Sequence, residues 1–142
     1  MYSQNIFLVN NYQLQKMDII SILKQDYQNF PANQHYDIFA EDFYFEGFFN
    51  KFRGIEIYKQ MINLYETGFI DTELKLVDIV KSEDIIKTQW ILSWTAPFPW
   101  KPRVTLPGRS EAKLNADGLI SSHIDYLDIS HSDLLKQLFQ VT

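Results

Sequence analysis

The ten residues IIKTQWILSW, at positions 85–94, carry the strongest strand signal in the chain. They are rich in β-branched and aromatic residues, which suit a pleated, packed surface. Bulky apolar residues stand on both faces of the run, which indicates a central strand. The turn-forming residues SED at 82–84 separate it from a second β-rich run at 73–81. Together the two runs predict a β-hairpin.

More strands are expected on the C-terminal side of this hairpin. Four prolines between positions 97 and 107 are expected to interrupt the pairing, which then resumes at 109–114. The residues NADG at 115–118 predict a hairpin turn, because Gly and Asn accept the backbone angles that such turns need. This turn leads into a last predicted strand at 119–128.

The N-terminal half has the helical period instead. Apolar residues recur every three or four positions at 11–30 and predict a helix that the following proline ends. A shorter helical piece is expected at 34–40 and an extended aromatic segment at 42–46. A second amphipathic helix is expected between Gly54 and Gly68, and the latter suits a helix C-terminus.

The order of these elements predicts an α+β domain. Helices precede the antiparallel strands, and Ser130 is suited to cap one last short helix at 133–139. This order favours N-terminal helices packed on the concave face of a curved antiparallel sheet. At 142 residues the chain is expected to form a single domain, with its core at about 11–139.

The composition narrows the classes of function. Without cysteine the chain has no thiol nucleophile, Cys-ligated zinc or iron–sulfur cluster. A formal charge of −5 argues against nucleic acid as a partner. No apolar run is long enough for a membrane span and the first ten residues do not resemble a signal peptide, so we expect a cytoplasmic protein without a membrane partner. The three histidines do not have the spacing of a metal site, so we expect no metal. The chain also has no nucleotide-binding motif, so we expect no cofactor.

Two groups of motifs resemble those of one known superfamily. They are YDIFAED at 36–42, FE at 45–46 and FRGIEIY at 52–58, and then TQWILSW at 88–94, FPWKPR at 98–103, PGRSE at 107–111 and GLISSHIDY at 118–126. The first group resembles the cone-shaped domains of the nuclear transport factor 2 superfamily, which includes steroid isomerases, scytalone dehydratase, polyketide cyclases and non-catalytic binders. The second group looks like a cyanobacterial and plastid family of unknown function within it. The likeness spans about residues 19–139 and implies a cone fold.

His123 and Asp125 are the first candidates for catalysis. Similarity to the steroid isomerases implies that they and Leu127 face the pocket, where the two would lie about 6–7 Å apart along the strand. A carboxylate beside a histidine can hold it in one tautomer for general acid–base work. Ser110, on the neighbouring strand, would join His123 in donating to a developing oxyanion. The alternatives are a purely structural pair or a solvent-facing His123.

The opposite face of the last strand carries Ile120, Ile124 and Tyr126. Hydrophobicity alone predicts that this apolar face is buried, whereas the resemblance implies that the opposite face points into the cone. The two expectations agree if the apolar face packs against the sheet of a second copy. Dimerisation through the outer sheet face is common in the superfamily. We therefore expect a homodimer.

Glu46 is the second candidate base. In the resembling enzymes a carboxylate follows this segment, usually as Asp-Pro, whereas here the dipeptide is Glu46-Gly47, which loosens the turn. Neighbouring phenylalanines are expected to desolvate the carboxylate and raise its pKa. The alternative is a solvated loop residue.

Other residues are expected to contact a ligand. Phe45 and Trp94 would form aromatic walls, although core packing explains a tryptophan on a strand equally well. Trp100 and Arg103 lie in the proline-rich loop and would meet an anionic group, with solvated loop charge as the alternative. His35 and His131 are expected to be exposed.

These residues leave two classes of function open. The first is a small-molecule-binding domain whose apolar cavity takes a carbonyl-bearing ligand, with proton transfer, isomerisation or dehydration by His123 and either Glu46 or Asp125. The second is a non-catalytic, dimeric interaction or scaffold protein whose cavity is filled by Phe and Trp side chains. The volume beside His123 would separate the two.

Overall fold

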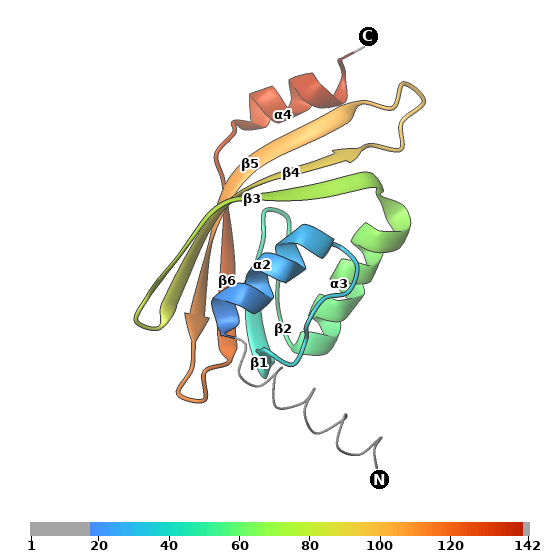
Figure 1. Ribbon diagram of the computed structural model, residues 1–142. Helices are drawn as coiled ribbons and strands as arrows, with labels where there is room; N and C mark the ends of the chain where they lie inside the picture. The colour runs from blue at the N-terminus through green and yellow to red at the C-terminus, as the bar shows by residue number, and fades with distance from the viewer. Residues whose placement is uncertain (1–17, 141–142) are drawn as a thin grey trace, which may run out of the picture.

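The computed structural model describes residues 18–140 and has one curved, unclosed sheet of six strands (Figure 1). The elements are α2 (Ile19–Asn29), β1 (Phe39–Glu46), β2 (Lys51–Arg53), α3 (Ile55–Gly68), β3 (Ile70–Ser82), β4 (Ile85–Thr95), β5 (Arg103–Leu114), β6 (Ile120–Leu127) and α4 (His131–Leu138). The strand order is β2-β1-β6-β5-β4-β3. Helices α2 and α3 lie on the concave side of the sheet, and α4 lies along β5 (Figure 1). The predicted α+β class and cone shape are confirmed.

The prediction of a wholly antiparallel sheet is wrong at one pairing. β1 runs parallel to β6, whereas all other neighbouring strands are antiparallel. After β2, helix α3 carries the chain to the far edge of the sheet, and the meander from β3 to β6 then returns to β1. The two ends of this path meet side by side in the same direction, which short-range patterns do not reveal.

Two features of the N-terminal half differ from the prediction. Helix α2 begins at Ile19, where Asp18 caps it by accepting a hydrogen bond from the Ser21 N–H at 2.8 Å; residues 11–17 of the predicted helix lie outside the described residues. The helical piece expected at 34–40 is absent, because β1 begins at Phe39. In its place the Gln34 amide donates to backbone carbonyls at 2.8 and 3.0 Å and holds the segment as a loop.

The expected break at the prolines is shorter than predicted. β5 begins at Arg103 and continues through Pro107, which pairs with Ile91 on β4. The Pro107 carbonyl accepts from the Asp128 N–H at 2.9 Å, so the backbone polar atoms of this proline face the point where β6 ends. In an antiparallel ladder the N–H and the C=O of one residue point to the same neighbouring strand. The N–H that Pro107 lacks would therefore also point to the end of β6, where its loss costs little stability.

A bulge in β6 changes the side chains that face inward. Lys113 pairs with Ser122, but Leu114 pairs with Ile120, so one extra residue stands between the two pairs. Ile120 therefore turns inward, is 1% exposed and belongs to the core, contrary to its predicted place on the outer face. Beyond the bulge, Ile124 pairs with Glu111 on the outer face as expected.

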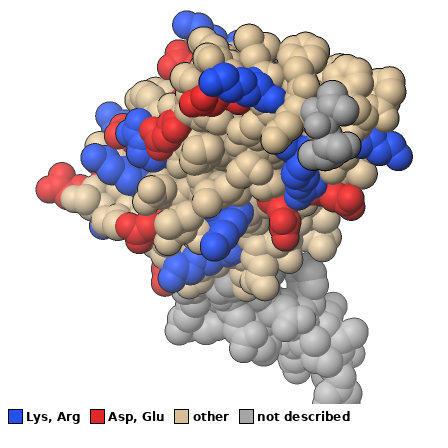
Figure 2. Space-filling model, turned by 90° about the horizontal axis from the view of Figure 1, so that it is seen from above, with Lys and Arg blue, Asp and Glu red and all other residues tan. Residues whose placement is uncertain are grey.

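Two hydrophobic clusters support the sheet from its concave side. One is built around Phe43, Ile86 and Ile120, and the other around Trp90 and Leu106. The last helix forms as predicted, with the Ser130 hydroxyl accepting from the Asp133 N–H at 3.1 Å. Acidic and basic residues are intermixed on the face seen in Figure 2. Among the described residues, no helix is long and apolar enough to cross a bilayer.

Candidate functional site

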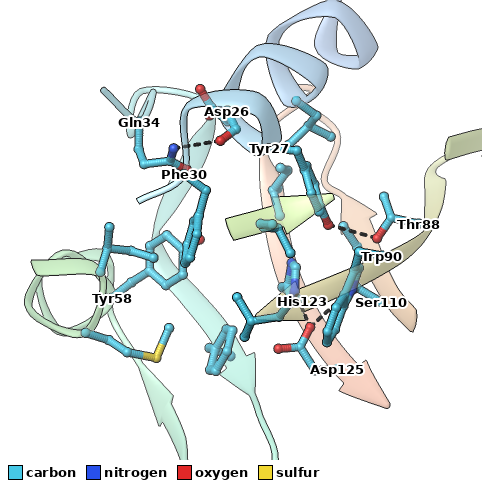
Figure 3. Close-up of a pocket in the computed structure, with 18 of the residues that line it drawn as sticks. Asp26, Tyr27, Phe30, Gln34, Tyr58, Thr88, Trp90, Ser110, His123 and Asp125 are labelled. Atoms are coloured by element: carbon cyan, nitrogen blue, oxygen red, sulfur yellow. Dashed lines mark hydrogen bonds and ion pairs between the residues drawn. The ribbon is translucent and has the colours of Figure 1, made fainter. Parts of the chain in front are cut away.

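A cavity of about 110 Å³ lies between the concave face of the sheet and helices α2 and α3 (Figure 3). Aromatic side chains dominate its lining, among them Tyr27, Phe30, Phe45, Tyr58, Tyr65 and Trp90. Such a volume holds several waters or one compact organic molecule. An aromatic lining with few polar groups is typical of small-molecule sites.

Three polar side chains form a row across the floor of this cavity. Thr88 on β4 pairs with Ser110 on β5, and Ser110 pairs with Asp125 on β6. Because paired residues of neighbouring strands project to the same face, all three point inward. Polar groups at such depth need hydrogen-bond partners within the protein.

A continuous chain of hydrogen bonds satisfies part of this need. The Trp90 Nε1–H donates to Ser110 Oγ at 2.7 Å, Ser110 Oγ donates to Asp125 Oδ1 at 2.6 Å, and His123 Nε2 lies 2.6 Å from the same oxygen. An indole N–H can only donate, so the hydroxyl accepts from it and turns its own hydrogen toward the carboxylate.

The hydrogen bond to Asp125 sets the tautomer of His123. A carboxylate oxygen only accepts, so Nε2 carries the hydrogen of this bond and donates it to Asp125 Oδ1. Neutral His123 then carries its lone pair on Nδ1. The ring also stacks on Phe45, with centroids 5.4 Å apart and an interplanar angle of 19°. These contacts orient the imidazole as general acid–base chemistry requires.

Burial also affects the tyrosines of the cavity. It raises the pKa of Tyr27 to about 12, and Tyr27 shares a hydrogen bond of 2.9 Å with Thr88. Burial likewise holds the pKa of Tyr58 well above 10 and raises the pKa of Tyr65. The charge of Asp125 contributes to all three shifts. At neutral pH the hydroxyls therefore stay protonated.

A second Asp–His pair was not anticipated. Asp26 lines the cavity from α2, and its Oδ1 lies 2.6 Å from Nδ1 of His35. The Asp26 side chain is 7% exposed, and burial raises the pKa of its carboxyl although the bonds from His35 oppose the shift. His35 is partly buried by this contact rather than exposed. The helical period held a signal, because Asp26 stands three residues after Leu23 and four before Phe30 on the apolar side.

The structure brings Phe45, Ser110, His123 and Asp125 together at the cavity but places Glu46 elsewhere. Alternation along β1 turns Phe45 inward and the next residue, Glu46, outward. There Glu46 accepts from the Tyr44 hydroxyl at 3.0 Å and lies 3.6 Å from Lys51 Nζ. The structure thus places Tyr44 and Lys51 at this carboxylate, and not the enclosure of phenylalanines that the sequence predicted.

Four further predicted ligand contacts lie away from the lining. Trp94 stacks on Phe69 with ring centroids 5.3 Å apart, and Leu127 packs into the second core cluster. The Trp100 Nε1–H donates to a backbone carbonyl of the last helix at 2.7 Å. Arg103 donates to a backbone carbonyl at the start of β3 at 2.6 Å. In the described residues these side chains serve packing and chain contacts.

Metal-binding geometry is absent from the part of the chain that the structure describes. No group of three or more His, Asp or Glu side chains there is placed to hold an ion. His123 and Asp125 bond one another, and so do His35 and Asp26. The acidic and imidazole groups of the cavity are therefore engaged in hydrogen bonds with one another.

Comparison with known proteins shows which family and which solved structures the chain is similar to. The profile of the family described as "Uncharacterized conserved protein (DUF2358)" matches residues 17–123. No curated protein matches the sequence. An NTF2-like protein of unknown function from Exiguobacterium sp. 255-15 is 25% identical, with a TM-score of 0.58 over 67% of this chain and 80% of that chain.

Other solved structures share the fold at lower identity. A hypothetical protein with a ketosteroid isomerase-like fold from Catenulispora acidiphila, solved in complex with trimethylamine, is 14% identical, with a TM-score of 0.67 over 84% of this chain and 90% of that chain. A protein described as a SnoaL-like polyketide cyclase from Jannaschia sp. CCS1 is 18% identical, with a TM-score of 0.66 over 83% and 89%. These matches confirm the predicted resemblance to the nuclear transport factor 2 superfamily. Its narrower cyanobacterial and plastid part stays a prediction.

Proposed function

The chain belongs to the uncharacterized conserved protein family DUF2358, and we propose that it binds a small, largely apolar molecule in the cavity and transfers a proton with the His123–Asp125 pair. One observation carries the proposal. The hydrogen-bond chain from Trp90 through Ser110 to Asp125 and His123 stands at the wall of an aromatic cavity. A structural pair would need no empty space beside it.

His123 is the acid–base group in this proposal. Its Nδ1 lone pair accepts a proton from an acidified C–H of the ligand while Nε2–H keeps donating its hydrogen bond to Asp125, whose carboxylate stabilises the imidazolium that forms. The same imidazolium returns the proton at another carbon or to a leaving hydroxyl, which is isomerisation or dehydration. Ser110 and Trp90 act through Asp125 as positioning residues, and the aromatic walls exclude water.

The similar structures support the proposal at the level of size and chemistry class. Several carry descriptions that name them as SnoaL-like polyketide cyclases or as an isomerase of the SnoaL-like family. The Catenulispora protein was solved in complex with trimethylamine, so a protein of this fold binds a molecule of that size.

The convex face of the sheet favours a second role, pairing with another copy of the chain. Tyr126 is 39% exposed on β6 and Val80 is 53% exposed on β3, both outside the cavity. The Arg109 guanidinium lies over the Tyr126 ring at 5.4 Å and pairs with Asp128 at 3.0 Å. A symmetric contact would cover this mixed face, and a scaffold function needs that contact without chemistry in the cavity.

A generic proton-transfer substrate tests the catalytic proposal without knowledge of the natural ligand. Flat, apolar 5-nitrobenzisoxazole loses its ring C–H proton to a base while its N–O bond breaks, which yields a coloured cyanophenolate. We expect saturable turnover that His123→Ala lowers by about 100-fold or more. The control is Glu46→Gln, which removes a carboxylate outside the cavity and should leave the rate unchanged.

Two results would refute the proposal. One is a wild-type rate no higher than that of free imidazole at the same concentration. The other is a folded His123→Ala variant that keeps the wild-type rate, because the base would then lie elsewhere.

A further inference from the structure

The walls of the cavity have an unbalanced charge. Among the described residues that line it are two carboxylates, Asp26 on α2 and Asp125 on β6, and no lysine or arginine. Figure 3 shows the two on different sides of the space, one beside the helix and the other on the sheet. The nearest basic side chains are His35 and His123, and each is already bonded to one of these two carboxylates. Among these described lining residues a bound anion would therefore meet no permanent positive charge.

One carboxylate oxygen is free to bind a ligand. Asp125 Oδ1 takes the bonds from both Ser110 and His123, while Oδ2 makes no hydrogen bond to any described residue. Among residues 18–140, only Thr72 Oγ1 is a fully buried side-chain oxygen or nitrogen without a partner. Oδ2 is therefore not sealed in protein, and Asp125 belongs to the cavity lining.

The aromatic residues favour the same sign of ligand charge. Ring faces carry negative potential and attract cations, an attraction that strengthens away from water. The cavity offers such rings on several sides, from Phe30 and Tyr58 on the helical side to Trp90 on the sheet. The negative field of Asp125 also reaches across the space, since it contributes to the raised pKa values of Tyr58 and Tyr65.

We infer that the cavity takes a compact organic cation, an alkylammonium whose nitrogen lies beside the free oxygen of Asp125 and whose carbon substituents contact the aromatic rings. The inference rests on the proposed function for the place of the site but does not require proton transfer. A neutral ketone or alcohol would use the rings equally well. It would gain no attraction between opposite charges from the two carboxylates.

A matched pair of probes isolates the charge. Choline and 3,3-dimethylbutan-1-ol have nearly the same shape and differ in the exchange of a positive nitrogen for carbon. Isothermal titration at pH 8 with the full chain is expected to show choline binding at least tenfold more tightly. Asp125→Asn should abolish most of this preference by weakening choline alone, whereas Glu46→Gln, which removes a charge outside the cavity, should preserve it.

The outcomes separate the inference from the proposed function. Equal or weaker binding of choline than of the alcohol overturns the cationic ligand, whereas turnover of the benzisoxazole would still support the proton-transfer site. Choline binding without turnover does the reverse. If Asp125→Asn fails to fold by circular dichroism, the wild-type pair of affinities decides by itself, and Asp26→Asn supplies a second carboxylate variant. A choline affinity that Asp125→Asn, correctly folded, leaves unchanged also overturns the inference.

Discussion

Alanine at position 108 would collide with the indole that begins the hydrogen-bond chain. Gly108 on β5 pairs with Trp90 on β4, and the indole lies across the glycine to reach Ser110. A Cβ atom on Gly108 would lie 2.4 Å from Cη2 and 2.7 Å from Cζ2 of Trp90. The ring cannot keep its place at such distances, because both are far inside van der Waals contact.

The expected cost of Gly108→Ala follows from two losses and one gain. Overpacking a tight core costs about 1–3 kcal/mol, and loss of the Trp90–Ser110 hydrogen bond adds about 0.5–1.5 kcal/mol. Replacing a flexible glycine returns about 0.5–1 kcal/mol through the unfolded chain. We therefore expect the free energy of unfolding to fall by about 0.5–4 kcal/mol. Ser110 also loses the donor that orients its hydroxyl toward Asp125, so benzisoxazole turnover should fall with it.

Urea unfolding followed by tryptophan fluorescence measures this effect. Gly68→Ala is the matched control, because a Cβ there meets nothing within 4 Å and the residue is the last of α3. We expect that variant to be as stable as the wild type or up to about 1 kcal/mol more stable. A Gly108→Ala variant with wild-type stability, emission and turnover would refute the role of the glycine in seating Trp90.

Three further predictions follow from other parts of the molecule. Because burial raises the pKa of Asp26 from 3.8, its ionisation opposes folding, and the stability that it contributes in acid is lost as pH rises from 3.8 through the raised value. Urea unfolding over this range should show wild type losing stability relative to Asp26→Asn; a pH-independent difference would contradict the shift. Ile120→Ala should cost about 2–5 kcal/mol because the bulge buries this side chain, whereas Ile124→Ala on the outer face should cost less than half as much, and equal losses in urea would argue against the bulge. Light scattering should give twice the chain mass of 16.8 kDa, with Tyr126→Glu shifting it to one chain; a wild-type monomer would reject pairing through the convex face.

Local patterns predicted much of the site. Alternation along the last strand, together with the resemblance, put His123 and Asp125 on one inward face, and neighbouring strands put Ser110 beside them. In the structure these three residues line the cavity and bond in one chain. The bulge did not disturb this, because it precedes His123 and changes only the direction of Ile120.

Residues whose surroundings come from distant segments were harder to place. Glu46 stands next to inward-facing Phe45 in the sequence, yet one step along a strand reverses the side chain and turns it to Tyr44 and Lys51. Asp26 and His35 are nine residues apart and meet only because the intervening chain turns back. A tryptophan on a strand suits core packing or ligand binding equally well. Trp90 donates to Ser110 only because Gly108, on the next strand, leaves room for its indole.

The sequence by itself determined the longer helices, the β-rich second half, the hairpin turns and most of the alternation of side chains, because these depend on the period and turn chemistry of adjacent residues. Only the tertiary structure decided that β1 lies parallel to β6, that a bulge turns Ile120 inward, and that two carboxylates share one aromatic cavity. Each of these depends on pairing or packing between segments far apart in the chain. Packing of the whole core selects these arrangements, and a short stretch of sequence does not contain the residues that form it.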